Sequence, residues 1–163
     1  MSDSAVLSDH VIDEIERWKA RFPAARQRSA VIGALHAVQH ECEGYLPAEQ
    51  MNAVAKYLDL PTIQVYEVAT FYSMFQTKRV GRHNVAICTN ISCKLRGADN
   101  IVDHVEKKLG IKLGESTDDG RIYLKKEEEC LAACCGAPMM MVDHEYHENL
   151  TTEQVDRILD ALD

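Results

Sequence analysis

Four cysteines in the second half of the chain form two close pairs. Four residues separate Cys88 from Cys93, three separate Cys130 from Cys134, and 36 residues lie between the pairs. Two such pairs at one end of a sheet would supply four thiolates, the ligand set of both a 2Fe-2S cluster and a structural zinc ion. Spacing alone therefore leaves both kinds of site open.

The other two cysteines are predicted to be inert core thiols, because cysteine is among the most frequently buried residue types. Cys42 stands alone near the end of an amphipathic helix. Cys135 directly follows Cys134, and adjacent residues rarely both point at one metal site. A redox dithiol is not supported, because the sequence has no C-x-x-C motif.

Two pairs of histidines also invite a metal-binding interpretation. His144 and His147 have the spacing H-x-x-H, not the H-E-x-x-H of zinc proteases, and are predicted to lie in a solvated loop. His36 and His40 share a helix face. Since the sequence places no carboxylate beside them, a surface or packing role is predicted for this pair.

Composition is that of an ordinary globular protein, with 163 residues, 46% hydrophobic and 27% charged. The net charge of -8 argues against a nucleic-acid partner. The sequence shows neither a signal peptide nor an apolar run of about 20 residues, so a cytoplasmic protein without direct membrane insertion is expected. A reducing compartment favours metal-ligand cysteines over disulfides.

Four short amphipathic helices are predicted in the first half of the chain. They cover residues 8–22 and 27–42, followed by one helix opened by Pro47 and another opened by Pro61. Ser8 is placed to cap the first of them. These elements predict a small helical bundle over residues 1–78.

The second half of the chain has a different sequence pattern, in which short β-prone runs alternate with amphipathic helices, and this pattern is typical of a compact α/β domain over residues 79–163. Strands are predicted at residues 84–88, 121–126 and 139–143, and helices at 100–110 and 151–162. Cys88 then ends the first strand and Cys93 lies in the loop after it. Cys130 and Cys134 lie between the two later strands, so the predicted fold class is α+β.

The cysteine segments "VAICTNISC" and "ECLAACCGAPMMMV" resemble the thioredoxin-like 2Fe-2S subunit of NADH:quinone oxidoreductase, respiratory complex I. The segment "VYEVATFYSMF" extends the resemblance into the helical half. It implies a thioredoxin-like fold for the second domain and one 2Fe-2S cluster, with Cys88, Cys93, Cys130 and Cys134 as its ligands. It implies no catalytic residue in this chain.

One residue departs from the family pattern. The family commonly has glycine after the Cys-Leu of the third ligand, where this chain has Ala132. If that position requires a positive φ, alanine costs on the order of 1 kcal/mol there.

The resemblance implies an electron-transfer subunit of a respiratory-chain NADH dehydrogenase. Its partners would be the FMN- and NADH-binding flavoprotein subunit and other peripheral-arm subunits, on the cytoplasmic side of the inner membrane. The acidic run at residues 127–129 suggests a low reduction potential. The alternatives are the equivalent subunit of an NAD-linked hydrogenase or formate dehydrogenase and, in a different class, a zinc-stabilised interaction module.

Overall fold

The structure, a computed structural model, describes residues 7–126 and 130–163. The chain divides into two compact units, Met1–Arg79 and Val80–Asp163, and each has its own hydrophobic core. That each unit folds as an independent domain remains a prediction.

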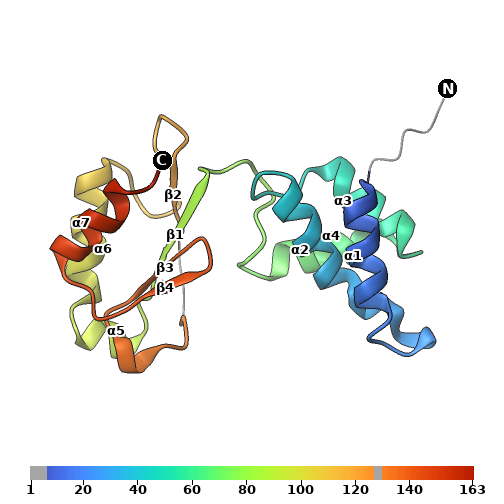
Figure 1. Ribbon diagram of the computed structural model, residues 1–163, viewed down its shortest axis with the longest axis horizontal. Coiled ribbons are helices and arrows are strands. Elements are labelled where there is room, and N and C mark those ends of the chain that lie inside the picture. The colour runs from blue at the N-terminus through green and yellow to red at the C-terminus, as the bar shows by residue number, and fades with distance from the viewer. Residues whose placement is uncertain (1–6, 127–129) are drawn as a thin grey trace. The chain divides into compact units, whose positions relative to one another are not determined.

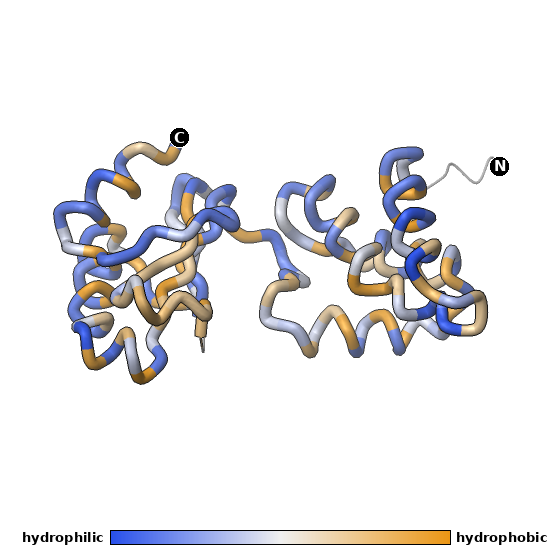
Figure 2. The backbone as a smooth tube through the Cα atoms, turned by 60° about the horizontal axis from the view of Figure 1, so that its bottom comes forward, coloured by the Kyte–Doolittle hydropathy of each residue, from blue (hydrophilic) through white to orange (hydrophobic). Residues whose placement is uncertain are grey.

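The N-terminal unit is helical. Its elements are α1 (Asp9–Lys19), the 3-10 helix η1 (Ala24–Ala30), α2 (Val31–Glu41), α3 (Ala48–Tyr57) and α4 (Thr62–Phe71). Ser8 caps α1 as predicted, because its hydroxyl accepts a hydrogen bond from the Val11 backbone N–H at 3.2 Å. Hydrophobic and hydrophilic positions alternate along these helices, as expected when one face of each is buried (Figure 2).

The single helix predicted over residues 27–42 is wrong at its start. The α-helical segment begins at Val31, and the residues before it form η1. No side chain from Ala24 to Ser29 is a large apolar group that packing could hold in an α-helical register. The chain adopts i to i+3 bonding instead, with the Arg26 N–H donating to the Pro23 carbonyl.

Helices α1 and α2 run antiparallel in close contact. At one end the Ser8 hydroxyl donates to the Glu41 carboxylate, with 2.6 Å between the oxygens. At the other end the ring of Trp18 lies on Gly33, where the Cβ of any other residue would overlap the ring. The missing side chain at Gly33 thus allows the aromatic ring to fill the space between the helices.

The aromatic residues at the end of α4 and just after it divide between core and surface. Phe75 is buried in the helical core, whereas Phe71 is 80% exposed and Tyr72 is 39% exposed. The two exposed rings contact each other edge to face, with 5.0 Å between their centroids.

The C-terminal unit contains a four-stranded sheet with the strand order β2-β1-β3-β4. Its strands are β1 (His83–Ile87), β2 (Ile122–Leu124), β3 (Met140–Val142) and β4 (Glu145–His147), and its helical segments are α5 (Ile91–Leu95), α6 (Ala98–Leu109), η2 (Cys134–Gly136) and α7 (Thr152–Asp160). β1 is parallel to β2 and antiparallel to β3, which pairs antiparallel with β4. α6 and α7 lie together on one face of the sheet (Figure 1).

The loop predicted around His144 and His147 is wrong in part. Asp143 and His144 form a turn with positive φ angles, and the chain returns as β4, in which His147 pairs with Met140. The strand carries polar residues and lies at the sheet edge, so it lacks the apolar pattern by which strands are recognised.

Hydrogen bonds to Asp143 connect the start of β1, including His83, to this turn. The Asp143 carboxylate accepts hydrogen bonds from the His83 ring and, at 2.8 Å, from the Asn84 backbone N–H. The bond with Asp143 is the main cause that raises the pKa of His83, against an opposing effect of burial, and Asp163 contributes further. Protonated His83 therefore stabilises the folded state.

We expect this stabilisation to be complete below the pKa of an unfolded-state histidine and to vanish as the pH rises through the raised folded-state pKa. The free energy of unfolding should fall over that interval by less than about 1 kcal/mol, as for other partly exposed ion pairs. Urea denaturation across this pH range measures the effect. The variant His83→Gln should lack this part of the pH dependence; an unchanged slope would show that another group causes it.

Candidate metal centre

The sheet topology brings the two cysteine pairs to the same end of the sheet. Cys88 directly follows β1, while Cys130 and Cys134 lie in the connection from β2 to β3. Because β1 is parallel to β2 and antiparallel to β3, the end of β1, the end of β2 and the start of β3 all lie at this end. α5 and η2 occupy the same region (Figure 1).

Cys88 and Cys93 form the buried half of this site, with exposed fractions of 2% and 1%. The Cys88 N–H donates to the Met139 carbonyl at 3.1 Å, which extends the β1–β3 pairing by one residue. The loop predicted for Cys93 is wrong, because this residue lies in α5. The Asn90 side chain caps that helix, whose five residues are too few to show a helical period.

Cys130 and Cys134 form the exposed half of the site. The Ala132 backbone N–H donates to the Cys130 sulfur at 3.3 Å, and Cys134 opens η2. Cys135 is also exposed, so the prediction of a buried thiol there is wrong. Its place in a short 3-10 turn, between Cys134 and the buried Gly136, leaves its side chain on the solvent side.

Cys42 lies at the end of α2, half-buried against the helical core. Burial raises the pKa of its thiol, and Glu41 and Glu43 raise it further. A thiol kept protonated in this way is a poor ligand and nucleophile, which agrees with the inert role predicted for it.

The thiols of the two pairs interact with one another. Burial pushes the pKa of Cys88 upward, but the backbone N–H groups of Leu131 and Asn90 and the side chains of Cys93 and Cys130 outweigh it, so the pKa is lowered. Burial, followed by the effect of Cys88, raises the pKa of Cys93 to about 11.

Within residues 7–126 and 130–163, no three His, Cys, Asp or Glu side chains are already grouped closely enough to hold a metal ion. The donor chemistry nevertheless fits a 2Fe-2S cluster. The Ala132 backbone N–H hydrogen-bonds the Cys130 sulfur, and such amide donors are typical of iron-sulfur sites. The acidic run at residues 127–129 lies outside the described residues.

The sequence analysis did not identify two charged residues in the segments next to the site. Lys125, at the end of β2, is only 7% exposed, and burial lowers its pKa. The Glu148 side chain lies on Gly136, where a Cβ would overlap it. Lys125 is two residues after the buried Tyr123, so in an extended chain the two side chains lie on the same side of the sheet, and this spacing is the sequence signal for the burial of Lys125. No sequence signal marks Glu148.

Ala132 has a φ of +59°, so the departure from the family pattern falls at a position that favours glycine. We expect Ala132→Gly to raise the free energy of unfolding by about 1 kcal/mol, because it removes the steric cost of a side chain in this conformation. Chemical denaturation of the two proteins measures the change. At the neighbouring Ala133, with a φ of -117°, the same substitution should instead destabilise the chain. Equal effects at both positions would contradict the argument.

The fold and the paired cysteines at one end of its sheet define a ferredoxin-like electron-transfer protein. The family model for thioredoxin-like [2Fe-2S] ferredoxins matches residues 15–163, and the chain belongs to this family. Membership confirms the predicted fold class and the predicted 2Fe-2S cofactor.

Curated relatives confirm the resemblance drawn from the cysteine segments. The E-type NADH-quinone oxidoreductase subunit of Rickettsia felis is 43% identical over 140 residues, which cover 86% of this chain and 83% of the relative. An E-type NADH-quinone oxidoreductase subunit of Rhizobium meliloti is 42% identical over 149 residues, which cover 91% of this chain and 86% of the relative.

A solved structure shares the fold. A chain of NAD+-reducing [NiFe]-hydrogenase in its air-oxidised state superimposes with a TM-score of 0.66 at 21% identity, over 77% of this chain and 22% of the hydrogenase chain. None of the helices in the described ranges is long and apolar enough to span a membrane.

Proposed function

We propose that the chain is the electron-transfer subunit of an NADH:quinone oxidoreductase and holds one 2Fe-2S cluster through Cys88, Cys93, Cys130 and Cys134. The observation that carries the proposal is the convergence of both cysteine pairs at one end of the sheet, in a chain of this family. Relatives that bear the name of this oxidoreductase, matched over more than four-fifths of their length, support the choice of complex.

When bound, the cluster supplies reversible one-electron transfer. The chain supplies the sulfur ligands, and backbone N–H groups that stabilise negative charge on them. Leu131, Ala137 and Met139 are buried with Cys88 and Cys93 and exclude water from the inner side. The exposed half of the site leaves the outer side open to an electron-transfer partner.

The oxidation of NADH belongs to a neighbouring subunit in this proposal, because the sequence carries neither a G-x-G-x-x-G nor a P-loop motif. That neighbour is the FMN- and NADH-binding flavoprotein, within a peripheral arm on the cytoplasmic side of the inner membrane. Ile63 and Phe71 on α4, 64% and 80% exposed, offer apolar surface for subunit contacts. The likeness to the hydrogenase rests on fold alone, so the quinone-linked complex is favoured.

A visible absorption spectrum of the anaerobically purified chain, before and after dithionite, tests the cofactor. We expect bands that bleach and about two irons per chain. A colourless chain with one zinc would overturn the iron-sulfur site. Purification of the tagged chain from its native cells then tests the complex: FMN and NADH-dependent reduction in the same fraction are expected, and hydrogenase activity there would reassign it.

A further inference from the structure

The contact between α1 and α2 brings two pairs of potential metal ligands face to face. His10 and Glu14 are four residues apart on α1, and His36 and His40 are four residues apart on α2, so each pair shares one helix face. The two fixed ends of the contact, Ser8 with Glu41 and Trp18 with Gly33, set the antiparallel register.

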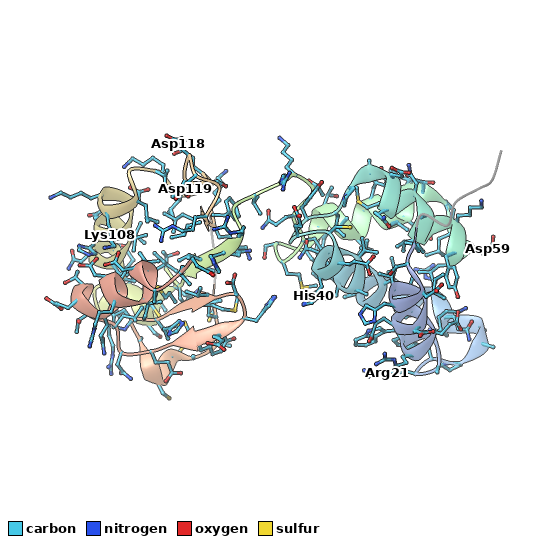
Figure 3. All side chains as sticks on the ribbon, turned by 45° about the horizontal axis from the view of Figure 1, so that its top comes forward. Arg21, His40, Asp59, Lys108, Asp118 and Asp119 are labelled. Carbon is cyan, nitrogen blue, oxygen red and sulfur yellow. The ribbon has the colours of Figure 1, made fainter. Side chains whose placement is uncertain are left out.

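In that register the position of His10 falls opposite His40, and the position of Glu14 opposite His36. All four side chains line one surface cavity of about 270 Å³, together with Trp18, Gly33 and Ala37. Figure 3 labels His40 near the end of α2. The sequence placed no carboxylate beside the histidine pair of α2; the helix packing does.

We propose that His10, His36 and His40, with Glu14, bind a zinc ion between α1 and α2. Imidazole and carboxylate groups are common zinc ligands, and two histidines one helical turn apart can chelate a single ion. Three imidazoles and one carboxylate complete the four-coordinate set that zinc prefers. The site is separate from the two cysteine pairs, which belong to the other unit.

Side chains must rotate for the ion to bind, because among the described residues no such group of ligands is already assembled. His10, His36 and His40 are exposed, and exposed side chains change rotamer readily. Glu14 forms an ion pair with Arg17 at 2.9 Å, which the metal would replace, and a surface pair of this kind contributes little. The His36 ring also contacts Phe75, with 4.9 Å between centroids, which places it beside the cavity.

The test uses the untagged full chain with its cluster loaded. Competition with a chromophoric zinc chelator measures the affinity and the stoichiometry. We expect one zinc per chain in addition to the iron. The variants His10→Gln, His36→Gln and His40→Gln should each weaken binding at least tenfold, as expected for a lost ligand, and Glu14→Gln should weaken it measurably. The control His144→Asn, a histidine exposed in the other unit, should bind as the parent does.

Either of two results with the variants would overturn the inference. Equal binding by the parent and the His36→Gln and His40→Gln variants would place the zinc elsewhere. Loss of binding in the α2 variants alone would reduce the site to one helix and remove α1 from it. Cobalt in place of zinc checks the ligand type: thiolate-to-cobalt charge-transfer bands would assign the ion to cysteines, and their absence supports the histidines. Iron content and circular dichroism confirm that each variant is folded and loaded.

Discussion

Replacing Cys134 by alanine is expected to remove the 2Fe-2S cluster, whereas replacing its neighbour Cys135 should leave the cluster in place. Both thiols are exposed, so the two substitutions disturb packing to a similar small extent. They differ in the role proposed for the sulfur, because loss of one thiolate from a four-cysteine set leaves one iron with one ligand too few. Iron per chain should fall from about two toward zero for Cys134→Ala and stay near two for Cys135→Ala.

The buried pair extends this test. Cys93→Ala should also abolish the cluster, and Cys42→Ala should retain it, since Cys42 belongs to the other unit. Iron analysis, the visible spectrum and circular dichroism on each variant separate loss of ligand from loss of fold. The assignment fails if Cys135→Ala loses the cluster and Cys134→Ala keeps it.

Replacing Gly81 by alanine is expected to destabilise the C-terminal unit more than any surface change. Gly81 is buried, and a Cβ there would overlap the backbone carbonyl carbon of Ile122 and lie 2.6 Å from the backbone nitrogen of Tyr123. Backbone atoms within a strand cannot move aside as the end of a side chain can. The chain before β1 would have to separate from β2, where His83 N–H donates to the Arg121 carbonyl at 2.8 Å.

Overpacking of this kind costs about 1 to 3 kcal/mol, and the clash with backbone places this substitution at the upper end. Thermal or urea denaturation, followed by circular dichroism, measures the loss. The substitution Lys78→Ala, at an exposed residue three positions earlier, is the matched control and should change stability by less than about 0.5 kcal/mol. Equal stability of the Gly81→Ala variant and the parent would show that the strand contact is looser than described.

The elements predicted correctly are those with a strong local signal. Ser8 caps α1, Thr151 and Gln154 form the capping box of α7, and Gly110 ends α6 with a positive φ. Each depends on hydrogen bonds within a few residues. β1 and β3 also have a strong local signal, because each is a short apolar run in the sequence, and both are largely buried on the sheet.

The elements that were missed depend on contacts distant in sequence. β4 is a polar strand that forms because His147 pairs with Met140. α5 has five residues, too few for a helical repeat of apolar positions to be seen in the sequence. The exposure of Cys135 follows from the turn in η2, which no spacing rule describes. The cavity between α1 and α2 also depends on distant contacts: helix packing brings His10 and His40 to the same cavity, so neither residue type nor spacing could show it.

The uneven burial of the four cysteines gives the site a direction. For a cluster held as proposed, Cys88 and Cys93 lie against the core, while Cys130 and Cys134 face solvent. Oxidants and chelators reach the second pair first, because sulfur reactivity follows exposure. Damage should therefore begin at Cys130 and Cys134, whereas burial protects the sulfur atoms of Cys88 and Cys93.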